Sequence, residues 1–243
     1  MATVYLAIQE SLDRSVALKI LDAIDMDTSD DLTERFLAEG RIVASLDHPN
    51  IITIYDIGIA DNTLYISMEY IQGGDLKQRL ELSFSSDEAL DYLNKIANAL
   101  SEAHKRGIIH RDVKPANMLE FSDTVKLGDL GIVKWSDFDP AFTEGGTITR
   151  QSVQLGSWFY MAPEQQEAPH NAINVSDIYA LGVSWIEMLA GTPPSPQAIG
   201  AKAYNLPHTK KGISEVISRM CSYNPNDRPS LREIHEIITA GYK

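Results

Sequence analysis

The sequence predicts an α+β protein with two lobes: a small antiparallel β-sheet carrying one helix, and a larger, mainly helical part. Three observations lead to this fold class. Short apolar runs with strand-like alternation fill much of the first 70 residues, and a glycine-containing break at Gln72-Gly73-Gly74-Asp75 follows them. Helical periodicity dominates the rest of the chain. We therefore expect one domain over residues 1–243, with an N-terminal lobe at 1–70, a hinge at 71–75 and a C-terminal lobe at 76–243.

A β-hairpin is expected at the N-terminus. Val4, Leu6 and Ile8 alternate with other side chains, a second apolar run covers residues 16–21, and residues 11–15 between them are typical of a turn. Lys19 interrupts the second run on the same strand face as Ala17. A lysine in such a run is usually a solvated edge residue, so this segment alone leaves that interpretation open.

A helix should follow the hairpin. After the start signal Thr28-Ser29-Asp30, apolar residues recur at helical spacing, namely Leu32, Phe36, Val43 and Leu46. Glu39 falls on the same stripe. A carboxylate on an apolar face needs a cationic partner, and Lys19 on the preceding strand is the candidate. The alternative for Glu39 is a partly exposed acid with no such partner.

Two more strands, at residues 51–57 and 63–70, complete the expected sheet. Beyond the hinge, Ser85 and Glu88 form a capping-box signal, and an apolar stripe then leads to Arg106-Gly107. A short strand at residues 125–127 ends in Gly128-Asp129-Leu130-Gly131. The C-terminal lobe is thus expected to open with a long helix.

Residues 110–117 read His-Arg-Asp-Val-Lys-Pro-Ala-Asn, with four residues between Asp112 and Asn117. Transfer of a phosphoryl group needs a carboxylate at the attacking hydroxyl, a cation on the phosphate and a metal ligand nearby. Asp112, Lys114 and Asn117 supply these groups, and Asp129 is a second metal candidate. The alternative is a charged surface turn ahead of Pro115.

Composition limits the function further. The chain has 243 residues, of which 44% are hydrophobic and 23% charged, as in ordinary globular proteins. A formal net charge of −13 argues against a nucleic-acid or anionic-membrane surface. The single cysteine, Cys221, excludes an internal disulfide and a multi-cysteine zinc site, and is expected to be a plain buried residue. We expect a cytoplasmic segment without membrane contact, although a full-length protein could be anchored through other regions.

Taken in order, these motifs resemble the bacterial eukaryotic-like (Hanks-type) Ser/Thr protein kinases, from Thr3 to about Ile238. The motifs that carry the resemblance are Val16-Ala17-Leu18-Lys19, Glu39, Met68-Glu69-Tyr70, the loop 110–117, Asp129-Leu130-Gly131, Ala162-Pro163-Glu164, Asp177 and Asp227-Arg228-Pro229. Leu130 departs from the Phe usual in the family triplet. The resemblance implies an enzyme that uses ATP and Mg²⁺ (or Mn²⁺).

The resemblance also implies roles for individual residues. Asp112 would be the base, Lys114 and Lys19 would contact phosphates with Glu39 orienting Lys19, and Asn117 and Asp129 would bind metal. The implied ATP-binding set is Met68 as gatekeeper, Glu69 and Ile71 as hinge backbone, Asp75 near the ribose, and Val4, Ala17 and Leu119 around the base. Glu164 and Arg228 would form a structural ion pair, and Asp177 would anchor the catalytic loop.

Between Gly131 and Ala162 lies a segment rich in Thr and Ser, which the resemblance identifies as the activation segment. We expect control by autophosphorylation at Thr149 or Ser152, with the added phosphate paired by Arg111. Ser157 would lie beside the catalytic Asp and Lys, which favours Ser/Thr acceptors. The implied partners are protein substrates, and a homodimer for autophosphorylation in trans.

Two departures from the family are visible. The phosphate-covering loop reads G-x-G-x-x-G-x-V, and aligning its valine on Val4 places the first two glycines before Met1. We interpret the sequence as beginning inside this motif, without the first strand of the sheet; the alternative function is a catalytically impaired kinase-fold binding or scaffold module. Residues 191–212, near the family's substrate-docking region, are shortened and Pro-rich. A small-molecule phosphotransferase is disfavoured by Ala162-Pro163-Glu164.

Overall fold

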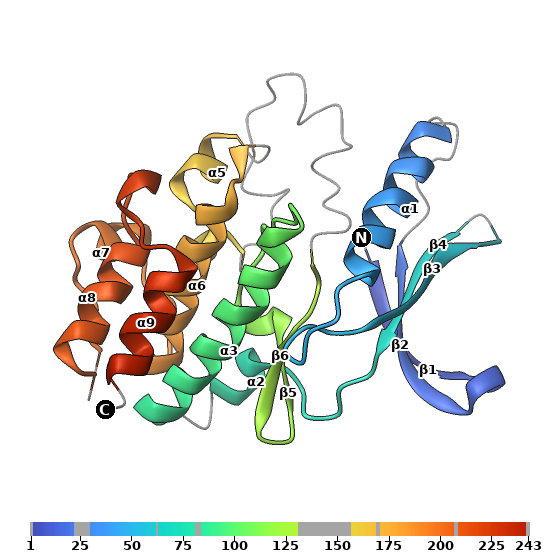
Figure 1. The fold of residues 1–243 in the computed structure, drawn as a ribbon, viewed down its shortest axis with the longest axis horizontal. Helices are drawn as coiled ribbons and strands as arrows, with labels where there is room; N and C mark the ends of the chain where they lie inside the picture. The colour runs from blue at the N-terminus through green and yellow to red at the C-terminus, as the bar shows by residue number, and fades with distance from the viewer. Residues whose placement is uncertain are drawn as a thin grey trace.

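The computed structural model describes residues 2–21, 30–61, 63–80, 84–130, 157–168, 171–206 and 209–241. Figure 1 shows the sheet and helix α1 on one side of the molecule, most of the helices on the other, and the β5–β6 hairpin between them. The predicted α+β class with two lobes is confirmed. The lobe boundaries themselves stay a prediction.

The sheet of the N-terminal lobe has the strand order β1-β2-β4-β3, with every neighbouring pair antiparallel. Its strands are β1 (Ala2–Gln9), β2 (Arg14–Leu21), β3 (Ile54–Ala60) and β4 (Thr63–Glu69). The predicted hairpin is confirmed, and its turn contains a short 3₁₀ segment, Glu10–Leu12, followed by Asp13 at a positive φ of 47°. In register, Val4 lies opposite Lys19, and Ala17 lies opposite Met68, so these side chains share one sheet face.

Strand β3 begins later than the sequence predicted. Ile51 forms a parallel bridge with Leu127, and the Ile52 N–H donates to the Leu127 carbonyl at 3.0 Å. These two apolar residues therefore dock on the C-terminal lobe instead of extending the sheet. An apolar run carries no information on which of two strands it will pair with, and the boundary prediction was wrong for that reason.

Helix α1 (Asp30–Ala44) packs its stripe on the sheet, and Phe36 and Val43 are buried there, with Leu46 just beyond the helix. Glu39 is exposed. The prediction that it lies on the buried face was wrong, because Gly40 and not Glu39 occupies the inward position between Phe36 and Val43.

The C-terminal lobe contains α2 (Leu76–Arg79), α3 (Ser86–Lys105), β5 (Met118–Phe121), β6 (Thr124–Leu127), α5 (Pro163–Glu167), α6 (Asn174–Ala190), α7 (Pro196–Gly200), α8 (Lys211–Met220) and α9 (Leu231–Gly241). The Glu88 N–H donates to the Ser85 hydroxyl at 3.2 Å, as the capping signal predicted. Strands β5 and β6 form an antiparallel hairpin.

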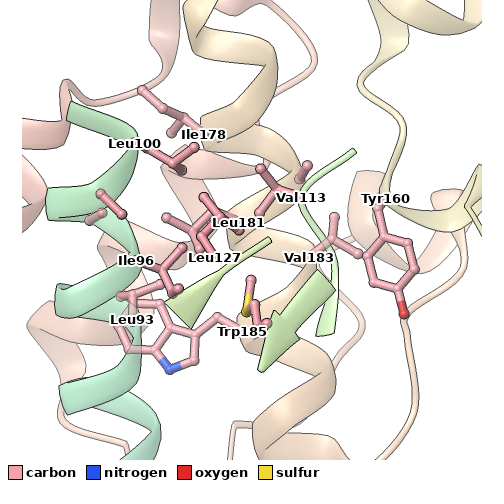
Figure 2. Close-up of a cluster of buried hydrophobic side chains, with 14 of the residues drawn as sticks. Leu93, Ile96, Leu100, Val113, Leu127, Tyr160, Ile178, Leu181, Val183 and Trp185 are labelled. Carbon is pink, nitrogen blue, oxygen red and sulfur yellow. The ribbon is translucent and has the colours of Figure 1, made fainter. Parts of the chain in front are cut away.

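The core of this lobe lies between α3 and α6. Figure 2 shows Leu100 of α3 and Ile178 of α6 beside Val113 of the catalytic loop and Leu127 of β6. Helix α6 is buried almost all round, and Trp185 fills the space beside α3. Because Val113 is fully buried in this cluster, the hydrophobic effect holds the catalytic loop against the core of the lobe.

The predicted hinge follows β4 and runs along β5. The Glu120 N–H donates to the Gly74 carbonyl at 2.9 Å, and Asp75 forms a bridge with Leu119. A Cβ on Gly73 would lie 2.2 Å from the Glu120 carbonyl oxygen, so only glycine fits this approach. Gly74 has φ +81°, a conformation that favours glycine. The two glycines therefore let this hinge segment, residues 71–75, which we call the connector, lie close against the β5–β6 hairpin.

Cys221 is buried, and burial raises the pKa of its thiol to about 12, which confirms the expected inert residue. Within the described ranges, no helix is both long and apolar enough to cross a membrane.

Candidate active site

The catalytic loop is anchored through Asp177 of α6. The buried Asp177 carboxylate accepts hydrogen bonds from the backbone N–H groups of His110 and Arg111, each at 2.8 Å. Arg111 has a positive φ of 66°, which is uncommon for a residue with a side chain. Charge-assisted bonds to a buried acid stabilise this conformation. The predicted anchoring role of Asp177 is confirmed.

His104 adds a third contact to this anchor, and the sequence analysis missed it. Its Nε2 lies 2.8 Å from Asp177 Oδ2, the oxygen that also accepts from the His110 N–H. The sequence does hold a signal for it, because His104 continues the α3 stripe of Ala97 and Leu100. A titratable residue on an apolar stripe needs a buried partner.

The charged groups of the loop meet around Lys114. Its Nζ lies 2.8 Å from Asp112 Oδ2 and 2.7 Å from Ser157 Oγ, the place that the resemblance implied for Ser157. The Asn117 amide donates to the Asp112 carbonyl at 2.8 Å and to its Oδ2 at 3.2 Å. A cation, a carboxylate and an aliphatic hydroxyl are thus brought together, and two donors fix the carboxylate.

His110 joins this loop to the segment that carries Asp129. Its buried ring accepts the Asp112 N–H at Nδ1 (3.2 Å), and Nε2 lies 2.9 Å from the Gly128 carbonyl. These partners require the neutral ring to carry its proton on Nε2. The Gly128 N–H donates in turn to the Asn117 carbonyl at 2.8 Å. The two loops are therefore held together at two points.

Asp129 forms an ion pair with Lys19 of β2. Partial desolvation of the carboxyl, whose side chain is 51% exposed, opposes ionisation, but the charge and hydrogen bond of Lys19 outweigh it and hold the pKa of Asp129 below its usual range. The next residue, Leu130, is buried, so a leucine packs where the family usually has Phe. The expected pairing of Lys19 with Glu39 stays a prediction.

Asn117 and Asp129 are suited to a hard divalent cation. The Asn117 amide nitrogen donates to Asp112, which leaves its carbonyl oxygen as the group that can bind a cation, and Asp129 offers a carboxylate. Among the described residues, no group of three or more His, Cys, Asp or Glu could hold a metal. A small donor set of this kind fits Mg²⁺, which retains water and phosphate oxygens as ligands.

The residues predicted to contact adenine and ribose come from the sheet, the connector and β5. Val4 is exposed opposite Lys19, Ile71 is buried in the connector, and Leu119 is held beside Asp75. The Asp75 carboxylate caps α2 by accepting the Gln78 N–H at 2.9 Å, which sequence reasoning did not anticipate. The contact of Asp75 with a ribose stays a prediction.

A buried acid supports the turn that holds Ser157. The Tyr160 hydroxyl donates to Glu187 of α6, and Lys77 of α2 forms an ion pair with the same carboxylate. Burial and the bond to Glu187 raise the pKa of Tyr160, which keeps its hydroxyl a donor. Thr149 and Ser152, the predicted phosphorylation sites, lie outside the described residues.

The predicted structural ion pair is present behind the site. Arg228 donates to Glu164 through both terminal nitrogens, at 2.6 and 2.8 Å, and the Ser176 hydroxyl donates to Glu164 at 2.6 Å. Burial of Glu164 opposes ionisation, but the bonds from Arg228 and Ser176 hold its pKa below the usual range. The pair ties α5 to the segment between α8 and α9.

The two-lobed fold and the assembled Asp112, Lys114, Asn117 and Asp129 define a phosphoryl-transfer domain of the protein kinase class. The chain belongs to the protein kinase domain family, which matches residues 1–238, and within it to the bacterial Hanks-type Ser/Thr catalytic domains. Members of this family use ATP and a divalent metal.

Named relatives support this placement. The chain is 41% identical over 197 residues to "Serine/threonine-protein kinase PrkC" of Bacillus subtilis (strain 168), covering 80% of the chain and 29% of that protein. It is 34% identical over 245 residues to "Serine/threonine-protein kinase PknA" of Mycobacterium tuberculosis (strain ATCC 25618 / H37Rv), covering 98% and 53%. The chain thus spans between about a third and a half of the length of these relatives.

Among solved structures, the chain is similar to two variants of the Mycobacterium tuberculosis PknI kinase domain. The TM-scores are 0.72 and 0.73, at 27% and 28% identity, and each alignment covers 100% of this chain and 91% of the other. The similarity extends over both lobes.

Proposed function

We propose that this domain transfers the γ-phosphoryl group of ATP to Ser and Thr hydroxyls of proteins, with Mg²⁺ or Mn²⁺ bound. One observation carries the proposal: Lys114 Nζ lies within 2.8 Å of the Asp112 carboxylate and within 2.7 Å of the Ser157 hydroxyl. The fixed loop thus brings a base and a cation to one point, beside an aliphatic hydroxyl. Phosphoryl transfer depends mainly on such positioning and charge stabilisation.

In the proposed reaction the substrate hydroxyl approaches Asp112, which orients it and accepts its proton. The new bond joins the hydroxyl oxygen to the γ-phosphorus, and the bond from that phosphorus to the bridging oxygen of ADP breaks. Lys114 stabilises the negative charge on the transferred group. Asn117 and Asp129 would hold the divalent metal, which would supply positive charge to neutralise the phosphates.

Lys19 is the proposed contact to the non-transferred phosphates. Its ion pair with Asp129 already brings the N-terminal lobe to the metal-binding carboxylate. Glu39, exposed on α1, is proposed to orient Lys19 once nucleotide is bound. Val4, Ala17, Met68, Leu119 and the backbone of residues 69–71 are proposed to surround adenine, and Asp75 to lie near the ribose.

Regulation is proposed to act through the activation segment. Autophosphorylation at Thr149 or Ser152, in trans within a homodimer, would add a dianion that Arg111 can pair. Arg111 suits this role because it belongs to the catalytic loop, where the bond of its backbone N–H to Asp177 fixes its position. Mass spectrometry that finds no phosphate on residues 131–156 of active protein would contradict this mechanism.

A radiolabelled-ATP assay with a generic protein acceptor tests the proposed activity. Asp112→Asn should lower transfer by about 10²- to 10⁴-fold, the range of general base catalysis, while leaving the melting temperature close to wild type. Asp129→Ala should abolish metal-dependent transfer. The impaired binding or scaffold function is not favoured, because the polar groups of the loop are all held in place. It would be supported if the wild type melted normally but transferred no phosphate.

A further inference from the structure

A side-chain ion pair joins the two lobes behind the proposed nucleotide site. Glu69 Oε2, at the end of β4, lies 2.8 Å from Lys126 Nζ of β6. Only 18% of the glutamate and 13% of the lysine side chain is exposed. The contact is thus shielded from water, and a charge-assisted hydrogen bond is stronger in such surroundings than at an open surface.

The same carboxylate is also fixed within its own lobe. The Thr53 N–H donates to Glu69 Oε2 at 3.2 Å, and the Glu69 N–H donates to the Thr53 carbonyl at 2.8 Å. Glu69 therefore has a defined orientation before Lys126 is considered. Because the side chain is held on one side by backbone, movement of β6 away from β4 must break the bond to Lys126.

The position of the pair gives it a consequence for nucleotide binding. Glu69 lies just before the connector, and Lys126 lies three residues before Asp129 on the same strand and loop. Lys126 is also the register partner of Leu119, a proposed adenine contact. The bond thus joins β4 to β6. Strand β4 leads to the backbone proposed to bind adenine, and β6 leads to Asp129, the carboxylate proposed to bind metal.

The other hydrogen bonds to β6 leave this contact between the lobes incomplete. Asn50 and Ile52 are hydrogen-bonded to β6, through bonds of Asn50 Nδ2 to the Val125 carbonyl (2.8 Å) and of the Ile52 N–H to the Leu127 carbonyl (3.0 Å). They belong to the segment before β3, at the other side of Thr53. Glu69 extends the contact to β4 itself, the central strand next to the connector.

We propose that Glu69 and Lys126 are positioning residues that hold the adenine side and the metal side of the site at a fixed separation, and so favour ATP binding. The inference rests on the proposed function for the identity of the nucleotide. Without the bond β4 and β6 are held together less firmly, and ATP must then order this part of the site when it binds. We expect a larger effect on ATP affinity than on turnover.

A double-mutant cycle with Lys126→Met and Glu69→Gln tests the inference in the 243-residue chain. MgATP titration by calorimetry should show each single variant binding about 5- to 10-fold more weakly, a typical coupling between sites. The double variant should bind no more weakly than the Lys126→Met variant. In kinetic assays the increase in KM for ATP should exceed the decrease in kcat. Lys105→Met is the matched control, because Lys105 is 69% exposed in its pair with Glu102.

Hydrogen exchange of the nucleotide-free protein separates this inference from the proposed function. Faster exchange at residues 70–75 and 124–129 in both single variants, and not in Lys105→Met, supports the positioning role even if the wild type fails to bind ATP. That failure would contradict only the proposed function. The positioning role would be overturned if both the exchange rates and the ATP affinity were unchanged. It would also be overturned if the two substitutions weakened ATP binding independently, so that the double variant showed the product of the two single fold-changes.

Discussion

Lys19 of the N-terminal lobe forms its ion pair with Asp129 of the C-terminal lobe, so the proposed phosphate-binding cation and a proposed metal ligand neutralise each other. The lysine comes from the middle of β2, and the aspartate follows β6 at a positive φ of 56°. The position of Lys19 is thus set by β2 and that of Asp129 by the end of β6. A bound nucleotide with its metal would have to replace the contact between them.

The ion pair predicts how acid acts on stability. The pKa of Asp129 is lowered below its ordinary value of 3.8 in the folded state, so its stabilising contribution is present above that value and is lost as pH falls through the lowered pKa. Asp129→Asn should therefore melt below wild type at about pH 7, and the difference should shrink as the pH falls below 3.8 and through the lowered pKa of Asp129. Calorimetric melting of both proteins across this range provides the measurement; a difference independent of pH would contradict the ion pair as its source.

Removal of the anchor of the catalytic loop should affect both stability and turnover. Asp177→Ala leaves two backbone N–H groups and His104 without their buried acceptor, at a cost of about 3–5 kcal/mol in the free energy of unfolding. Urea unfolding measures this loss. Asp177→Asn keeps one carbonyl oxygen and should fall between the two proteins. If Asp177→Ala unfolded like the wild type, the carboxylate would not be the anchor.

The Glu164–Arg228 pair should matter for folding and not for chemistry. The Arg228 guanidinium is fully buried, so Arg228→Ala should lower the free energy of unfolding by about 3–5 kcal/mol. Arg219→Ala is the matched control, because the pair of Arg219 with Glu233 is largely exposed and worth less than about 1 kcal/mol. Turnover per folded molecule should change little in either variant.

Some of the fold and site followed from the sequence because local chemistry decides them. The hairpin, the Ser85 cap and the spacing of residues 110–117 depend on neighbours in the chain. Contacts between distant segments were harder to predict. Ile51 pairs with β6 instead of β4, and Glu39 is exposed, because apolar patterning shows that a face is buried and not what covers it.

The same limit applies to polar partners. Resemblance named Asp177 and the Glu164–Arg228 pair, and both contacts are present. It did not give His104 as a partner of Asp177 or Lys126 as a partner of Glu69, because neither His104 nor Lys126 lies in a motif that carries the resemblance. Hydrogen bonds of this kind depend on the packed geometry, which sequence spacing does not encode.

The connector glycine gives a steric prediction. A Cβ at Gly73 would lie 2.2 Å from the Glu120 carbonyl oxygen, so Gly73→Ala must push the connector away from β5. Strain of this kind costs about 1–3 kcal/mol in the free energy of unfolding, and it should weaken ATP binding at the adjacent backbone. Gly212→Ala is the control, because no atom lies within 4 Å of its added Cβ. Thermal melting should separate the two variants, and equal melting temperatures would contradict the close approach.

Ser157 provides the sharpest test of the polar cluster. Its hydroxyl accepts from Lys114 at 2.7 Å, so Ser157→Ala removes this contact and leaves the contact of Lys114 with Asp112. The ammonium group should then be drawn closer to the base and away from the phosphoryl group, and kcat should fall about 10-fold, as expected for a charge-assisted bond worth about 1.5 kcal/mol. Ser157→Thr keeps the hydroxyl and should retain most of the activity. If alanine and threonine lowered kcat equally, the hydroxyl would not be the group that positions Lys114.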